Sequence, residues 1–152
     1  MKIHLVPVND DNKEAVLQLS VREDQPFVAT NEESLLDAEE CNEDYPGTAR
    51  PFAIYADEQL VGFCLLGFDP DEEDELGRFL LWRFMIDKNH QGKGYGQAAL
   101  AQIIRYYRDN GADRLLLSTE PENQRGIHVY RKAGFRETGE FNDDEAVMKM
   151  ML

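Results

Sequence analysis

FMIDKNHQGKGYGQAAL, residues 84–100, links the end of an apolar run to the start of an amphipathic one. Three glycines, Gly92, Gly94 and Gly96, occupy every second position between the two runs. Glycine loses more conformational freedom on folding than any other residue, so three together indicate backbone that bends sharply or closely approaches a ligand. The apolar residues that follow recur at helical spacing and predict a long helix from Gly96 to Asn110. We therefore expect a strand, a glycine loop and a helix, in that order.

The rest of the chain contains segments with the alternating hydrophobic pattern of strands and segments with the 3.6-residue pattern of helices. Strands are expected over residues 2–8, 51–56, 60–68, 78–87, 113–119, 135–139 and 146–151. Further helices are expected after Asn9 or Asp10, from Glu32 to Cys41 and from near Pro121 to near Gly134, with Pro26 separating the first two. No repeat or linker interrupts this order. We expect one α/β (α+β) domain over residues 1–152, with a mixed central sheet flanked by helices.

Three of these elements carry specific expectations. The nearly continuous apolar run over 78–87 is typical of a central strand with both faces covered. The second helix should turn Leu35, Leu36 and Ala38 inward. DPDEEDE, residues 69–75, should form a loop that is too charged to pack.

Composition and charge argue against several classes of protein. The chain has 152 residues, 42% of them hydrophobic, which suits one folded domain with a substantial core. No apolar run approaches the roughly 20 residues needed to cross a membrane, and no signal peptide is evident, so we expect no membrane partner. The net charge of −14 argues against nucleic acid, since phosphate binding needs a positive surface. Cys41 and Cys64 lack metal-like spacing, so we expect two reduced thiols in the cytoplasm and no metal site.

The negative charge is concentrated in the first half of the chain. Residues 1–76 carry 4 Lys and Arg against 20 Asp and Glu, whereas residues 77–152 carry 12 against 10. Nine acidic residues and no basic ones lie between Arg22 and Arg50. Solubility is the simpler explanation for any single exposed carboxylate. The asymmetry as a whole favours a cation near the first half and an anion near the second.

Three kinds of ligand-binding loop use closely spaced glycines, and spacing separates them. A P-loop needs Ser or Thr after Gly-Lys, but here Gly94 follows. A dinucleotide fingerprint needs GxGxxG directly after its strand, but Gln97 replaces the third glycine. A Gln-x-x-Gly-x-Gly loop between a strand and a long helix matches Gln91, Gly94 and Gly96. In such a loop, backbone N–H groups and the positive end of the helix dipole bind a pyrophosphate.

A second motif accompanies the loop. FMIDKNHQGKGYGQAAL followed by LLLSTEPENQRGIHVYRKAGF, residues 115–135, resembles the GNAT family of N-acetyltransferases, which bind acetyl-CoA. The resemblance is close over the C-terminal half. The acidic N-terminal half looks like the bacterial polyamine and diamine acetyltransferases of that family, the spermine and spermidine type. The resemblance implies that the strands matching 79–86 and 113–119 splay apart, and that the protein forms a homodimer.

The resemblance also implies a set of cofactor-binding residues. The loop from Gln91 to Gln97 would bind the pyrophosphate, with Lys93 adding positive charge. Strand backbone would pair with the pantetheine arm, Asn123 would hydrogen-bond that arm, and Tyr130 would lie near the thioester sulfur. The residues assigned in this way are Phe84, Met85, Ile86, Gln91, Gly92, Lys93, Gly94, Tyr95, Gly96, Gln97, Asn123 and Tyr130.

The residues themselves support a role for Tyr130. On a helix, Asn123, Ile127 and Tyr130 fall at i, i+4 and i+7 and share one face. Amine attack on a thioester expels a thiolate, and a hydroxyl beside that sulfur can act as general acid. Without the surrounding motif, a tyrosine packed under the sheet would be the preferred explanation. His128 lies off this face, and we expect a packing or surface role for it.

The acceptor side is less defined by the sequence. Glu33, Asp37 and Glu40 fall at i, i+4 and i+7 of the second helix and could hold ammonium groups, although a solvated face is the simpler explanation for each. Glu120 follows a strand beside the cofactor gap and is a candidate base for the proton of the amine. Trp82 and Arg83 alternate along the cofactor strand, so one of them should face the acceptor. Core burial is the alternative for Trp82.

These observations predict an acetyl-CoA-dependent N-acetyltransferase. Its acceptor would be a primary amine of a small cationic molecule, a polyamine or diamine, which attacks the thioester directly. Two alternatives stay open. One is a different acceptor, such as an aminoglycoside, an amino acid or a protein N-terminus, and the other is a non-catalytic acetyl-CoA-binding sensor.

Overall fold

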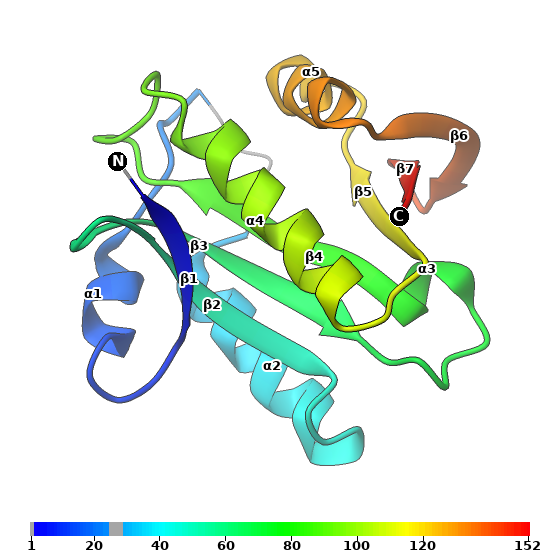
Figure 1. Cartoon of the computed structure of the whole chain (residues 1–152), viewed down its shortest axis with the longest axis horizontal. Helices are drawn as coiled ribbons and strands as arrows, with labels where there is room; N and C mark the ends of the chain where they lie inside the picture. The colour runs from blue at the N-terminus through cyan, green and yellow to red at the C-terminus, as the bar shows by residue number, and fades with distance from the viewer. Residues whose placement is uncertain (1, 25–28) are drawn as a thin grey trace.

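A mixed sheet of seven strands forms the centre of the protein in a computed structural model, which describes residues 2–24 and 29–152 (Figure 1). The strands are β1 (Ile3–Pro7), β2 (Ala49–Ala56), β3 (Gln59–Phe68), β4 (Phe79–Ile86), β5 (Arg114–Thr119), β6 (Arg136–Asn142) and β7 (Glu145–Met151). The helices are α1 (Lys13–Gln18), α2 (Asn31–Asp44), α3 (Glu75–Arg78), α4 (Tyr95–Asp109) and α5 (Gln124–Ala133). This confirms the expected α/β architecture. Pro26 lies outside the described residues.

The sheet is divided between β4 and β5. The strand order is β1-β2-β3-β4-β5-β7-β6, and every neighbouring pair is antiparallel except β4 and β5. Those two run parallel and share a single registered pair, Leu80 opposite Leu116. Beyond that pair the strands diverge, so among the described residues the backbone of the second half of β4 has no strand partner on that side. The predicted splay of the central strands is confirmed.

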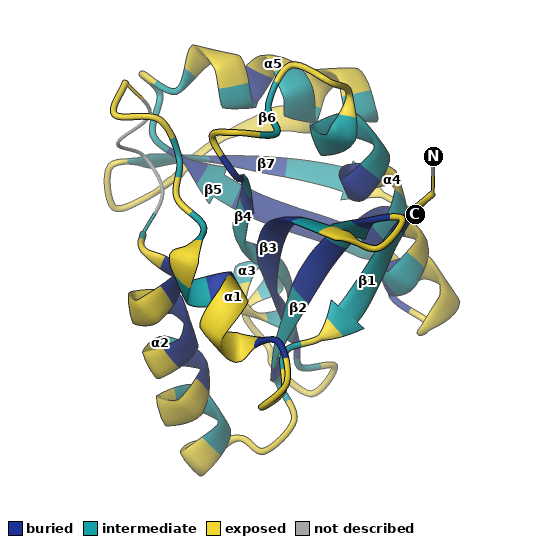
Figure 2. Cartoon of the chain, turned by 90° about the vertical axis from the view of Figure 1, so that its left-hand side faces the viewer, coloured by how far each residue is buried: buried dark blue, intermediate teal, exposed yellow. Residues whose placement is uncertain are grey.

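Helices cover both faces of the sheet. α1 and α2 pack on one face through Val16, Leu35 and Ala38 (Figure 2). α4 packs on the other face through a stripe that recurs at helical spacing, and α5 adds Ile127 to the same core. The stripe consists of Ala99, Leu100, Ile103, Ile104 and Tyr107. The glycine loop between β4 and α4 therefore leads from the middle of the sheet to a firmly packed helix.

The inward face of α2 differs from the prediction. Leu35 and Ala38 are buried, but Leu36 is 53% exposed, and the buried polar residues Asn31 and Ser34 complete the face. Successive helical residues are about 100° apart, so a narrow stripe that holds Leu35 leaves Leu36 at its edge. The burial of the Asn31 side chain is compensated by a hydrogen bond that its Nδ2 donates to the Val16 carbonyl oxygen at 2.8 Å.

β4 is less buried than its apolar sequence predicts. The fully covered strand is β3, where residues 61–66 are all buried, whereas β4 alternates between buried and half-buried residues. A β-bulge interrupts this strand, because Leu66 pairs with Leu81 and Leu65 pairs with Arg83. Trp82 is the extra residue, and it shifts the alternation along the strand. The half-buried residues of β4 are thus left to face cavities.

The acidic loop is exposed over residues 70–74, as expected, but its last residue is held by the sheet. Its last residue, Glu75, begins the one-turn helix α3 and forms ion pairs with Arg114 on β5 and Lys149 on β7. Hydrogen bonds from Lys149, and then from Arg114, hold the pKa of the Glu75 carboxyl below its usual value. These pairs are partly exposed, so each stabilises the fold only modestly. These ion pairs attach the end of the loop to strands β5 and β7.

Candidate active site

The start of α4 is an uncapped helix N-terminus. Gly94 is the N-cap residue with φ 82°, and it has no side chain to accept a hydrogen bond. The first turn of a helix leaves its N–H groups without intrahelical partners, so those of Tyr95, Gly96 and Gln97 remain available. Gly92 also has positive φ, 78°. These residues form a positive, donor-rich turn that is suited to a pyrophosphate.

A buried carboxylate fixes the segment before this turn. Asp87 is 5% exposed, and its two oxygens accept hydrogen bonds from the backbone N–H groups of Ser20 at 2.9 Å and Asn89 at 3.1 Å. The Lys88 N–H in turn donates to the Ser20 carbonyl oxygen at 2.8 Å. The loop is therefore attached both to its own strand and to the segment that follows α1.

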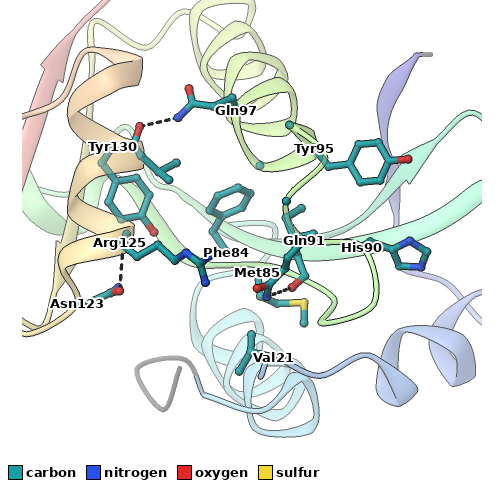
Figure 3. Close-up of a pocket in the computed structure, with 16 residues that line it drawn as sticks. Val21, Phe84, Met85, His90, Gln91, Tyr95, Gln97, Asn123, Arg125 and Tyr130 are labelled. Atoms are coloured by element: carbon teal, nitrogen blue, oxygen red, sulfur yellow. Dashed lines mark hydrogen bonds between the residues drawn. The ribbon is translucent and has the colours of Figure 1, made fainter. Parts of the chain in front are cut away.

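Backbone groups of β4 face the gap between β4 and β5. The Asp87 N–H donates to Val61 on β3, which turns the preceding carbonyl, that of Ile86, toward the gap. That carbonyl accepts a hydrogen bond from Gln91 Nε2 at 2.9 Å (Figure 3). Because strand residues alternate, Phe84 and Ile86 present their N–H groups on the same side. An extended ligand in the gap could pair with this edge as an added strand.

The glycine turn, the β4 edge and α5 enclose a cavity of about 310 Å³, which we call the loop cavity. Its lining comprises Val21, Phe84, Met85, Ile86, His90, Gln91, Gly92, Gly94, Tyr95, Gly96, Gln97, Asn123, Arg125, Gly126, Val129 and Tyr130. Figure 3 shows Tyr130 and Arg125 extending from α5 toward Phe84 across the gap. The cavity thus offers apolar walls, a donor-rich turn and one guanidinium.

Asn123 is fixed at the start of α5. It caps the helix, with Oδ1 accepting from the Gly126 N–H at 3.2 Å and Nδ2 donating to Thr119 Oγ1 at 3.0 Å. A Cβ on Gly126 would overlap the Asn123 amide, so any larger residue there would displace the cap. Oδ1 can accept a second hydrogen bond, and one N–H of Nδ2 also remains available for a ligand.

Tyr130 keeps its proton in this setting. Its ring lies between Phe84 and Phe135, with centroid distances of 6.5 and 6.0 Å. Burial raises the pKa of Tyr130 to about 12, because the phenolate would lose its hydration. Its hydroxyl makes no hydrogen bond within the described residues. Tyr130 is therefore a protonated donor at the gap over the whole physiological pH range.

A second cavity, which we call the polar cavity, adjoins the first. It measures about 320 Å³ and is lined by Ala29, Leu80, Leu81, Trp82, Arg83, Phe84, Leu117, Ser118, Thr119, Asn123, Tyr130, Asn142 and Glu145. Phe84, Asn123 and Tyr130 line both cavities. A ligand that fills the loop cavity and one that fills the polar cavity would meet at these three residues.

The structure brings most of the expected residues together, but not all. Trp82 and Arg83 both line the polar cavity, although only one was expected to, because the bulge at Trp82 changes the alternation. Lys93 is exposed and outside both linings, and Arg125, which sequence reasoning missed, supplies the positive charge of the loop cavity. Its position two residues after Asn123, in the first turn of a helix, was the available signal. His128 is exposed, as expected.

The acidic candidates are spread more widely. Asp37 forms an ion pair with Arg83 at 3.2 Å and so reaches the polar cavity indirectly. Glu33 and Glu40 are exposed and line neither cavity, and Glu120 is also absent from both linings. Glu145, which sequence reasoning missed, is the carboxylate in the lining of the polar cavity. It lies 25 residues beyond Glu120 in sequence, and only the pairing of β5 with β7 places it there.

The described residues also bear on whether the chain has a metal site, a membrane-spanning helix or a disulfide. Within residues 2–24 and 29–152, no three His, Cys, Asp or Glu side chains are grouped to hold a metal ion. In the same part of the chain, no helix is long and apolar enough to span a membrane. Cys41 and Cys64 are not joined in a disulfide.

Comparison with known proteins identifies the class of protein that this fold and site define. Residues 14–135 match the model of the acetyltransferase (GNAT) family, and the chain belongs to that family. The chain is therefore an acyltransferase, an N-acetyltransferase that uses acetyl-CoA.

Two relatives match the chain over almost its full length. It is 35% identical to a probable spermine N(1)-acetyltransferase of Bacillus subtilis subsp. natto, over 98% of this chain and 99% of the relative. It is 34% identical to the spermine/spermidine N(1)-acetyltransferase of Bacillus subtilis strain 168, with the same coverage.

Solved structures share the fold. A spermidine N-acetyltransferase from Vibrio cholerae, in complex with CoA and spermine, superposes with a TM-score of 0.72 at 19% identity, over 98% of this chain and 95% of that one. The PaiA N-acetyltransferase of Thermoplasma acidophilum, in complex with coenzyme A, superposes with a TM-score of 0.74 at 16% identity, over the whole of both chains.

Proposed function

We propose that this enzyme acetylates a primary amine of a polyamine or diamine, with acetyl-CoA held in the loop cavity and the amine in the polar cavity. One observation supports this most strongly. The two cavities have different chemistry and share Phe84, Asn123 and Tyr130, so two unlike ligands can meet there. The names of the two Bacillus relatives support a polyamine as the acceptor.

The residues of the loop cavity fit acetyl-CoA. The uncapped turn at Tyr95, Gly96 and Gln97 would bind the pyrophosphate, and Arg125 would add charge. The open edge of β4 at Phe84 and Ile86 would bind the pantetheine amides. When bound, acetyl-CoA supplies the activated acetyl group as a thioester.

Tyr130 would act as the general acid. Its hydroxyl oxygen keeps a proton because burial raises the pKa of Tyr130 to about 12. Tyr130 would deliver that proton to the departing sulfur, and Asn123, held by Thr119 and Gly126, would orient the ligand beside it. Glu120 lines neither cavity, so it is poorly placed to take the proton of the amine. Solvent in the cavity would serve instead.

The first-half acidic residues would attract the acceptor rather than contact it. Glu33 and Glu40 are exposed on α2, which is the helix whose Asp37 reaches Arg83. Their field would raise the local concentration of a polycation, an effect that salt weakens. The Trp82 ring also lines the polar cavity, and because the Arg83 guanidinium lies over it at 5.5 Å, an ammonium group would need its other face.

We also propose a cytoplasmic homodimer. Two unpaired thiols, Cys41 and Cys64, suit a reducing compartment. β6 is an exposed edge strand that includes Phe141, which is 63% exposed, and such an edge suits a second copy. Light scattering on the purified protein would give the mass directly.

The acceptor is tested by a panel assayed through release of free thiol from acetyl-CoA. Spermidine, spermine and a short diamine should be acetylated with higher kcat/KM than an aminoglycoside, an amino acid or a peptide with a free N-terminus. A mass shift of one acetyl group on the product should accompany thiol release. Turnover of the aminoglycoside or peptide alone would contradict the polyamine proposal, and no turnover with any amine would favour a sensor.

A further inference from the structure

The polar cavity has two charged lining residues, and their surroundings differ. Arg83 forms an ion pair with Asp37 at 3.2 Å, and its guanidinium lies 5.5 Å from the Trp82 ring. Glu145 forms no ion pair within the described residues, and its Oε1 accepts a hydrogen bond from Ser118 Oγ at 2.7 Å. The positive charge in this cavity is therefore neutralised, and the negative charge is not.

The fold fixes the place of this carboxylate. Glu145 is the first residue of β7 and pairs with Asn142 across the turn from β6. Beside it, Ser118 on β5 pairs with Val147, so the hydroxyl that holds the carboxylate comes from the strand that borders the gap. Glu145 and Tyr130 line the same cavity from β7 and α5. A molecule that fills this cavity would therefore meet both Tyr130 and a carboxylate that has no ion-pair partner among the described residues.

We propose that Glu145 binds the ammonium group of the acceptor that does not react, and so selects acceptors with two or more amines. This rests on the proposed function. A carboxylate stabilises the charged form of an ammonium group beside it, which raises the pKa of that group. The nitrogen that attacks must instead lose its proton, so pairing it with Glu145 would oppose the reaction. The fixed carboxylate therefore suits the second nitrogen, which stays protonated throughout.

Glu145→Gln tests this assignment. The amide keeps an oxygen that can accept from Ser118, so the variant removes charge with little change of shape. We expect kcat/KM for spermidine and a short diamine to fall about tenfold or more, mainly through KM, because a charged hydrogen bond is lost. A monoamine with a neutral tail of equal length should change less than about twofold, because it has no group to pair with Glu145. The diamine preference over this monoamine should disappear.

Asp144→Asn is the matched control. Asp144 is the neighbouring residue, is exposed and lies outside the lining, so the variant makes the same change of net charge beside the cavity. It should keep the diamine preference of the wild type. Glu145→Asp gives a second measurement, because it withdraws the carboxylate by one methylene. The preferred diamine should then become longer by about one methylene.

The possible results distinguish a failure of the Glu145 assignment from a failure of the proposed polyamine acetylation. If the wild type acetylates polyamines and Glu145→Gln keeps its diamine preference, the inference is wrong and the proposed function stands. An equal fall for the diamine and the monoamine would place Glu145 at the reacting nitrogen and overturn the inference as well. A wild type that acetylates no polyamine would overturn both. Should Glu145→Gln fail to fold, an unchanged chain-length preference in Glu145→Asp would overturn the inference.

Discussion

The loop cavity and the polar cavity, which meet at Tyr130, differ in the groups that form them: mainly backbone in the first and mainly side chains in the second. The loop cavity depends on backbone: two glycines with positive φ, the free N–H groups at the start of α4 and the open edge of β4. The polar cavity depends on side chains from β4, β5 and β7, among them Arg83, Ser118 and Glu145. Recognition by backbone suits a ligand that is the same throughout a family, such as a cofactor. Recognition by side chains suits a ligand that differs between relatives, such as an acceptor.

This difference determines what each mutation should do. Changes to the shared residues should affect chemistry, changes to the loop cavity should affect cofactor binding alone, and changes around the polar cavity should affect only the acceptor. The variants below test that separation.

Tyr130→Phe should have the largest effect. It removes the hydroxyl and keeps the ring between Phe84 and Phe135, so we expect turnover to fall by a factor on the order of 10²–10⁴ with little change in affinity for acetyl-CoA. Because the pKa of Tyr130 is raised to about 12, the hydroxyl stays protonated below that pH. The wild-type rate should therefore rise with the fraction of neutral amine up to about pH 10, without a falling limb from Tyr130. Single-turnover rates across this pH range would measure both effects.

Gly94→Val should weaken the cofactor alone. Gly94 has φ 82°, and a β-branched residue there carries a strain of about 1–2 kcal/mol or more. The turn should relax away from the left-handed conformation, and the dissociation constant of CoA should rise about tenfold or more while the acceptor specificity stays the same. Gly111→Val is the matched control, because Gly111 has φ 90° and equally open surroundings at the other end of α4. Calorimetry that finds equal CoA affinity in the two variants would contradict the assignment.

Asp37→Asn should have a moderate effect, confined to the acceptor. It leaves the Arg83 guanidinium, whose side chain is 24% exposed, without its ionic partner in the polar cavity. The uncompensated positive charge should repel a polycation, so we expect KM for spermidine to rise several-fold while CoA binding is unchanged. Steady-state kinetics with spermidine and with a neutral-tailed monoamine would show whether the effect depends on acceptor charge.

Glu33→Gln combined with Glu40→Gln should have the smallest effect. Both residues are exposed and outside the cavities, and single exposed pairs contribute only about 0.2–1 kcal/mol. We expect kcat/KM for spermidine to fall less than about threefold at low salt and not at all at high salt. A larger loss that persists at high salt would mean that these carboxylates contact the acceptor after all.

The same contrast explains what the sequence could and could not predict. The strand, glycine turn and α4 are contiguous over residues 79–109, and their local patterns were sufficient to place them. The polar cavity gathers residues from Ala29 to Glu145, and its geometry depends on a bulge and on strand pairing. Trp82 and Arg83 therefore took an orientation that simple alternation does not give. For the same reason Glu145, which lies on a different strand from Glu120, could not be placed at the cavity from the sequence.

The single registered pair between β4 and β5 has a consequence for the stability of the protein against proteolysis in the cell. Leu80 and Leu116 are the point where the two halves of the sheet join, and an extended cofactor in the gap would act as the missing strand. Binding then contributes to folding, since a ligand at 100 times its dissociation constant stabilises the native state by about 2.7 kcal/mol. We expect CoA to slow hydrogen exchange on both sides of the seam, in β4 and in β5, by comparable factors. The supply of cofactor would then set how long each copy of the enzyme resists proteolysis.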